Sequence, residues 1–194
     1  RILPDSCRPL PFEDDGLLFL CEFTDLAEQV CPRAVLRKVL ERARKLGFEA
    51  YAGFEYEVFF FNETPESVRA KNYRDLKPMA PGWFGYSVIR NTVAADFYRQ
   101  MLATCEAMDF GIEGLQEETG PGVIEAAIAF EEALASADKA ALFKTFVKVL
   151  AQRSNMMATF MAKWSQQYPG QSGHIHLSLK KNGESGFFDA NAQH

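Results

Sequence analysis

The chain has 194 residues, 47% hydrophobic and 24% charged, which is typical of a globular protein with one sizeable core. Its 26 acidic and 21 basic residues give a net charge of −5. This balance argues against nucleic acid as the main partner, because phosphate binding requires a basic surface. The sequence lacks an apolar run of the ~20 residues that cross a bilayer, and it lacks an apolar signal core near its start. We therefore expect a cytoplasmic protein with no membrane partner.

The four cysteines are widely spaced and form no Cys-x-x-Cys motif; they are Cys7, Cys21, Cys31 and Cys105. We expect reduced thiols rather than a disulfide framework. That expectation agrees with a cytoplasmic location.

The first part of the chain predicts two strands separated by a helix. Residues 17–23 form a short apolar run, which indicates a buried strand. Pro32 opens a helix that Gly47 closes. Residues 49–61 alternate and are rich in Phe and Tyr, which favours a second strand. The helix repeats apolar residues at a spacing that predicts a buried face, made of Val35, Leu36, Val39, Leu40, Ala43 and Leu46.

The rest of the chain alternates between helices and strands. Residues 62–90 are rich in Pro and Gly and predict mostly loop. Helices are expected over 93–108 and over 137–153, the second capped by Ser136 or Asp138. The expected strands cover 112–118, 123–129, 156–164 and 174–180. Because the strands carry polar faces, we predict an antiparallel or mixed sheet with helices on one side.

Two glutamates lie within the strand predicted for residues 49–61. Glu55 and Glu57 are two positions apart, so strand alternation places both carboxylates on one face. Like charges repel unless a cation lies between them, and the surrounding Phe and Tyr residues favour a shielded site. The alternative is an exposed sheet face with two solvated glutamates, and this pair alone leaves both interpretations open.

A second pair of glutamates flanks a glycine-rich segment. If Pro121 and Gly122 are the central residues of a tight turn, Glu118 faces Glu125, since each lies three residues outside them. Directly opposed side chains have Cβ atoms ~5 Å apart, which suits two ligands of a hard cation. The alternative is a surface loop whose acidic residues are simply solvated.

Two of the three histidines lie in the strand predicted for residues 174–180. Alternation predicts a polar face, made of His174, His176 and Ser178, and a buried face behind it, made of Ile175, Leu177 and Leu179. The alternative is a structural pair of histidines. Taken together, the four carboxylates and one imidazole favour Mg²⁺ or Mn²⁺ over structural zinc. They could hold two ions of the kind that bind phosphoryl groups during transfer.

Several motifs follow one another along the chain: Gly53-Phe-Glu-Tyr-Glu57, Gly85-Tyr86, Glu118-Thr-Gly-Pro-Gly-Val-Ile-Glu125, Phe160-Met-Ala-Lys163 and Gly173-His-Ile-His-Leu-Ser-Leu179. In this order they resemble the catalytic domain of the glutamine synthetase family, from about residue 30 to the end. The resemblance implies an α+β fold with a curved, mainly antiparallel sheet and helices on one side. It also implies a ring-shaped homo-oligomer.

The resemblance divides the metal ligands between two sites. Glu57, Glu118 and Glu125 would hold one Mg²⁺ or Mn²⁺ ion. Glu55 and His174 would hold another ion near the phosphates of ATP.

The resemblance also assigns residues to the substrates. Tyr86 and Glu118 would act at the reacting groups, with Tyr86 lining the ammonium or amine site, and Gly170 would contact glutamate. The implied reaction phosphorylates the γ-carboxylate of glutamate with ATP, after which ammonia or an amine attacks the acyl phosphate to form an amide. The residues matched to the ATP side are Glu113, Phe130, His176 and Ser178.

Two segments depart from the usual family pattern. Gln116-Glu117-Glu118 replaces His-His-Glu, and Gly170-Gln-Ser-Gly173 replaces a Gly-Ser-Gly-Met sequence. Both resemble the branch that joins glutamate to polyamines or other amines.

The ends of the chain indicate a fragment, since it starts at Arg1 and stops after residues 187–194 without a terminal element that looks complete. We assign residues 1–30 to a remnant of, or linker from, an N-terminal domain and residues 31–194 to the N-terminal part of a catalytic domain. Further family ligands lie downstream, so we expect the fragment to be inactive alone. Two alternative functions are a non-catalytic structural or binding member of the family and a two-metal phosphohydrolase.

Overall fold

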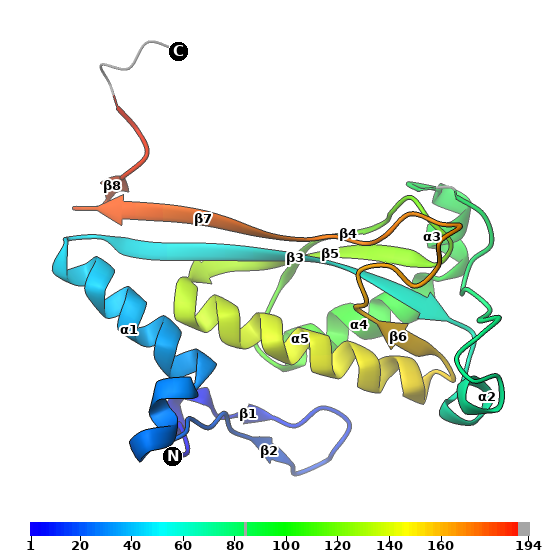
Figure 1. Ribbon diagram of the computed structural model, residues 1–194, viewed down its shortest axis with the longest axis horizontal. Coiled ribbons are helices and arrows are strands. Elements are labelled where there is room, and N and C mark those ends of the chain that lie inside the picture. The colour runs from blue at the N-terminus through cyan, green and yellow to red at the C-terminus, as the bar shows by residue number, and fades with distance from the viewer. Residues whose placement is uncertain (84, 190–194) are drawn as a thin grey trace.

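One antiparallel sheet carries helices on a single face in the computed structural model, which describes residues 1–83 and 85–189. The strand order is β4-β5-β3-β7-β8, and β6 pairs separately with β3. Helices α1, α4 and α5 lie below the sheet in Figure 1. This arrangement confirms the predicted α+β class with a mainly antiparallel sheet. Part of the predicted C-terminal segment, residues 190–194, lies outside the described residues.

Strand β3 is the central strand of the sheet. It spans Glu49–Phe61, as predicted, and its last four residues, Val58-Phe-Phe-Phe61, are fully buried. Its partner on one side is β5 (Val123–Glu132). On the other side it pairs first with β7 (Gly173–Lys181) and then with β6 (Met157–Thr159). The outer strands are β4 (Ile112–Glu117) and β8 (Glu184–Ser185).

Five α-helices and a small hairpin complete the described part of the chain. The hairpin consists of β1 (Arg8–Pro9) and β2 (Leu17–Leu18), and the 3₁₀ turns η1 and η2 cover Pro4–Ser6 and Asp25–Val30. The helices are α1 (Pro32–Lys45), α2 (Pro65–Ala70), α3 (Val88–Val93), α4 (Ala95–Ala107) and α5 (Ala133–Arg153).

The main core lies between α5, α4 and the sheet. Phe143 and Leu150 of α5 pack into one buried cluster with Val58 and Phe60 of β3 and Ile124 of β5. Burying side chains of this size contributes roughly 1.5–3 kcal/mol each. This contact holds β3 and β5 rigidly side by side, so their other face can present side chains in a fixed register.

The segment 17–23 is not the buried strand predicted from its apolar run. Only Leu17 and Leu18 are extended, and Leu17 and Phe23 are exposed. The segment forms a hairpin with β1 outside the main sheet, and only Leu18 and Leu20 pack partly against the main core. Its most buried side chain is instead charged, Glu22.

The apolar face predicted for α1 is confirmed for half of its residues, since Leu36 and Ala43 are partly buried. Leu40 is buried, but Val35, Val39 and Leu46 are exposed. Helix α1 contacts α5 and β3 along a narrow strip around Leu40, Ala52 and Ala133, so a wide apolar face is not used.

The face of β7 that was predicted to be buried is exposed to solvent. Ile175 and Leu177 are exposed, since α5 packs against β3 and β5 rather than under β7.

Three further boundaries differ from the predictions. Residues 62–90, predicted to be mostly loop, contain α2 and the start of α3. A capping box formed by Thr64 and Ser67 stabilises the N-terminus of α2. Only three residues of 156–164 form a strand, because the chain turns away from β3 after Thr159.

The cap predicted for the last helix is wrong. Helix α5 begins four residues before residue 137, because the Glu132 carboxylate accepts hydrogen bonds from the N–H groups of Leu134 and Ala135. Ser136 and Asp138 therefore lie inside the helix.

All four cysteines are free thiols, as predicted. None of the helices in the described residues is both long enough and apolar enough to cross a membrane.

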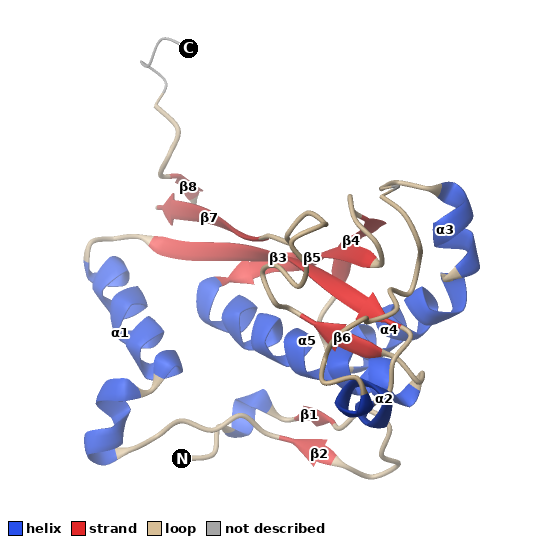
Figure 2. Cartoon of the chain, turned by 45° about the vertical axis from the view of Figure 1, so that its right-hand side comes forward, coloured by secondary structure: helices blue, strands red, loops and turns tan. Residues whose placement is uncertain are grey.

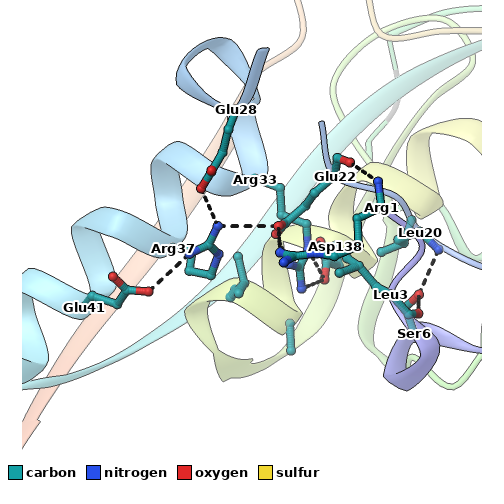
Figure 3. A network of polar contacts seen from close by, with 12 residues as sticks. Arg1, Leu3, Ser6, Leu20, Glu22, Glu28, Arg33, Arg37, Glu41 and Asp138 are labelled. Atoms are coloured by element: carbon teal, nitrogen blue, oxygen red, sulfur yellow. Dashed lines mark hydrogen bonds and ion pairs between the residues drawn. The ribbon is translucent and has the colours of Figure 1, made fainter. Parts of the chain in front are cut away.

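A buried carboxylate joins the N-terminal segment to the helices (Figure 3). Glu22 is 2% exposed and contacts three arginines: Arg1, at 2.9 Å, Arg33 and Arg37. Arg33 also binds Asp138 of α5 at 2.9 Å. Burial opposes ionisation of Glu22, but hydrogen bonds from Arg33 and Arg1 outweigh it and hold the pKa of this carboxyl below its usual value.

We expect Glu22→Gln to lower the free energy of unfolding at pH 7 by about 2–3 kcal/mol, because charge-assisted hydrogen bonds at a buried position are lost. Glu41→Gln, in the exposed Arg37–Glu41 pair, is the matched control and should cost less than about 1 kcal/mol. Urea unfolding measures both.

The effect of Glu22→Gln should also depend on pH. The folded pKa of Glu22 lies below its ordinary value of 4.5, so its contribution is complete above that value and is lost as pH falls through the folded pKa. The wild-type and variant stability curves should therefore converge in acid. A difference that stays constant down to the acid transition would contradict the role assigned to the Glu22 charge.

Candidate functional site

The register of β3 places two pairs of functional side chains next to each other. Glu55 lies directly opposite His174 of β7, and Glu57 lies directly opposite Glu125 of β5. Because Glu55 and Glu57 share one face of β3, both pairs point away from the helices. The structure therefore brings together four residues that are separated by up to 119 positions in the sequence.

Glu55 contacts both histidines of β7. One of its carboxylate oxygens lies 3.2 Å from His174 Nδ1 and 3.1 Å from His176 Nε2. The contact with His176, followed by that with His174, lowers the pKa of Glu55 even though partial burial opposes this. Glu55 is thus held ionised between two imidazole rings.

The turn between β4 and β5 is longer than predicted. Glu125 pairs with Gln116 rather than with Glu118, because five residues, 118–122, lie between the two strands. Glu118 lies diagonally from Glu125 on the same face, and the Gln116 side-chain amide donates to both carboxylates, at 3.2 and 3.0 Å. Glu118 and Glu125 are therefore not a directly opposed pair; both accept hydrogen bonds from Gln116, which lies between them.

The carboxylates at this site act on one another. Burial raises the pKa of Glu125, and the negative charges of Glu55, Glu118 and Glu57 raise it further. Such repulsion is relieved when a cation occupies the space between the groups.

The geometry of these residues fits a divalent cation. Glu55, Glu125 and His174 can each offer one ligand atom, and these atoms lie within 4.8 Å of one another. Carboxylate oxygens with an imidazole nitrogen form a donor set suited to Mg²⁺ or Mn²⁺. The division into one site of Glu57, Glu118 and Glu125 and another of Glu55 and His174 stays a prediction.

Tyr86 joins this cluster from the loop before α3. Its hydroxyl donates to Glu118 at 2.5 Å, and its backbone N–H donates to the Glu117 carbonyl at 3.1 Å. The bond to Glu118, and then the charge of Glu118, raises the pKa of Tyr86. Gly85 permits the close approach, since a Cβ there would lie 3.2 Å from the backbone of residues 118 and 119.

The four residues matched to ATP surround one groove beside Glu55. This groove has a volume of about 540 Å³, which is within the range of small-molecule sites. Its floor includes Gly53, where an added Cβ would lie 3.3 Å from the Cβ of Phe130. The Phe130 ring is exposed beside the groove. The matched residues in the lining are Glu113, Phe130, His176 and Ser178.

The segment around Gly170 reaches the same cluster through Ser172. The Ser172 hydroxyl donates to the Glu57 carboxylate, and the Glu57 N–H donates to the Ser172 carbonyl at 3.1 Å. At Gly170 a Cβ would lie 2.6 Å from the Ala162 carbonyl oxygen, so only glycine fits without a shift of the backbone. The role of Gly170 toward glutamate stays a prediction.

Two residues that orient the carboxylates were missed from the sequence. Gln116 and Ser172 each lie in a segment that departs from the family pattern, and each donates a hydrogen bond to a candidate metal ligand. A polar residue two positions from a ligand on the same strand face could have indicated Gln116. Nothing comparable indicates Ser172, which lies in a loop.

Comparisons with known proteins show what the chain as a whole is similar to. A family profile described as "Glutamine synthetase, catalytic domain" matches residues 29–194. The chain is 40% identical over 189 residues to "Type-1 glutamine synthetase 2" of Dictyostelium discoideum, covering 94% of this chain and 36% of that protein. It is 32% identical over 183 residues to "Glutamate--isopropylamine ligase" of a Pseudomonas species, covering 92% and 40%.

A solved structure described as a complex of GmaS with ADP has a similar fold. It superposes with a TM-score of 0.84 at 24% identity and covers 98% of this chain and 44% of that one. The chain thus spans less than half the length of the relatives that it matches.

We expect Glu57→Ala and Glu125→Ala each to weaken Mn²⁺ binding by about tenfold or more, because each removes a charged oxygen ligand from the cluster. Glu49→Ala is the matched control, since Glu49 is exposed at the far end of the same strand. Titration of Mn²⁺ followed by electron paramagnetic resonance measures the affinity. If both site variants titrate like the wild type and Glu49→Ala, the shared site is wrong.

Proposed function

The chain belongs to the glutamine synthetase family, and we propose that its parent protein is an ATP-dependent carboxylate–amine ligase. In this proposal ATP phosphorylates the γ-carboxylate of glutamate, and ammonia or an amine then displaces the phosphate to form an amide. The observation that carries the proposal is the single cluster of Glu55, Glu57, Glu118, Glu125 and His174 beside a groove large enough for a nucleotide.

Each part of the site has a task in this reaction. Glu57, Glu118 and Glu125 would hold one Mg²⁺ or Mn²⁺ ion, and Glu55 and His174 another. Bound there, the ions would neutralise phosphate charge and hold the two substrates in line. Hydrogen bonds from Gln116 and Ser172 fix the orientation of the ligand carboxylates before any substrate arrives.

The groove beside Glu55 suits the nucleotide. The exposed Phe130 ring offers a flat apolar surface for a base. His176 and Ser178 supply polar groups from the adjacent strand, and Glu113 supplies another from the opposite wall. The groove leads toward Glu55, so a nucleotide lying in it would place its phosphates near the carboxylate cluster.

Tyr86 and Glu118 form the proposed binding point for the amine. The carboxylate of Glu118 attracts an ammonium group, and the Tyr86 hydroxyl bound to it fixes its direction. Glu118 would take part in positioning the amine near the acyl phosphate, and Gly170 would contact glutamate. The acceptor class in this proposal is ammonia or an amine, in agreement with a relative named as a glutamate–isopropylamine ligase.

The setting of the protein completes the proposal. We place it in the cytoplasm, which suits four free thiols. We assign residues 31–194 to the N-terminal part of the catalytic domain, in a ring-shaped homo-oligomer, and residues 1–30 to a segment that leads from an N-terminal domain.

The intact protein should release ADP from ATP and glutamate only when an acceptor is present. The assay compares ammonia, methylamine, isopropylamine, ethanolamine and putrescine as acceptors and detects the amide by mass spectrometry. With at least one of these acceptors the protein should form ADP and amide in equal amounts. The Glu118→Gln variant should form neither product.

Two outcomes would contradict the ligase. ADP release that needs no acceptor and yields no amide would indicate a phosphohydrolase. Binding of Mn²⁺ and ATP without turnover for any acceptor would indicate a non-catalytic member of the family.

A further inference from the structure

A second cavity lies on the opposite side of β4 from the carboxylate cluster. Strand alternation directs Gln116 and Glu118 toward the cluster and Glu117 toward the helices. The cavity has a volume of about 580 Å³, and residues of α3 line part of it. Helix α3 lies at the edge of the molecule, near β4 (Figure 2). Most of the lining is apolar and includes Met79, Ile89, Val93, Phe97 and Met156.

A buried, unpaired carboxylate lies in the wall of this cavity. Glu117 is 5% exposed, and its Oε2 atom has no hydrogen-bond partner among the described residues. Unpaired buried polar atoms are costly, so the unpaired oxygen of Glu117 in the cavity wall indicates a place for a ligand.

A positive charge lines the same cavity. Arg90 of α3 is half-buried. Burial raises the pKa of Glu117, and the positive charge of Arg90 opposes this rise. Within the described residues no ion pair joins Arg90 to Glu117, so the two groups face the cavity separately. A ligand with one charge would satisfy one of these groups and be repelled by the other.

We propose that this cavity binds an apolar α-amino acid of about the size of leucine. The ammonium group would bind Glu117, the carboxylate would bind Arg90, and the side chain would lie against Ile89, Val93 and Phe97. The chemistry of the walls selects for all three parts: opposite charges for the zwitterion, and an apolar surface for the side chain. A cavity of this volume accommodates such a molecule.

The site is separate from the groove proposed for ATP and from the carboxylate cluster. Glu117 and Glu118 point to opposite faces of β4, so a ligand on Glu117 does not compete for the groups that would bind metal or amine. One backbone contact joins the two sides, in which the Tyr86 N–H donates to the Glu117 carbonyl. Binding of a ligand in this cavity can therefore be tested independently of the ligase reaction.

A photoreactive analogue of leucine with a diazirine side chain locates the site. After irradiation of the intact protein, we expect labelled peptides that contain α3 or Met156, and an excess of leucine should prevent the labelling. Labelling confined to the segment 169–178, or the absence of leucine-protected labelling, would overturn the proposal.

Calorimetry with leucine then tests the two charged groups. Glu117→Gln and Arg90→Gln should each weaken binding by about 10- to 100-fold, which is the worth of one charge-assisted hydrogen bond. Glu106→Gln and Arg74→Gln are matched controls on the exposed surface and should leave the affinity unchanged. Equal affinities in the wild type and in either site variant would overturn the assignment.

Three analogues test the parts of the ligand without changing the protein. 4-Methylpentanoate lacks the ammonium group, 3-methylbutylamine lacks the carboxylate, and glycine lacks the side chain. Each should bind at least about tenfold more weakly than leucine. If any of them binds as tightly as leucine, the corresponding contact is wrong and the proposal fails.

Discussion

The alternation of side chains along β3 is the constraint on which the rest of the structure depends. Phe54, Tyr56, Val58 and Phe60 point toward the helices and contribute to the main core. Glu55 and Glu57 lie between them in the sequence and must point the other way. A shift of the strand by one residue would bury both carboxylates and expose the aromatic rings, so the core contacts fix the register of the site.

The same constraint explains why four like charges can lie together. Each carboxylate is attached to a strand that the core holds in place, so repulsion among them cannot separate the strands. Burial, and then the neighbouring negative charges, raise the pKa of Glu125. Gln116 and Ser172 then orient individual carboxylates without neutralising them. The cluster is thus preorganised for a cation by protein groups that hold its carboxylates in place.

The features predicted well from the sequence are those that depend on strict alternation within one strand. The bounds of β3, the shared face of Glu55 and Glu57 and the polar face of β7 follow from a period of two. The errors arise where a distant element decides the outcome. The exposed Val39 of α1, the cap of α5 at Glu132 and the pairing of Glu125 with Gln116 depend on which element packs nearby and on the length of a turn. Glu22 was missed because its arginine partners lie far from it in the sequence and are brought next to it only by the packing of the helices, which an apolar run does not reveal.

The central claim is that the face of β3 that carries Glu55 and Glu57 holds divalent cations. Anomalous diffraction from crystals of the intact protein grown with Mn²⁺ and ADP tests it most directly. The account predicts Mn²⁺ peaks about 2.1–2.4 Å from carboxylate oxygens of Glu57, Glu118 and Glu125 and from Glu55 and His174. Anomalous peaks located elsewhere, with this face of the sheet free of metal at saturating Mn²⁺, would contradict it.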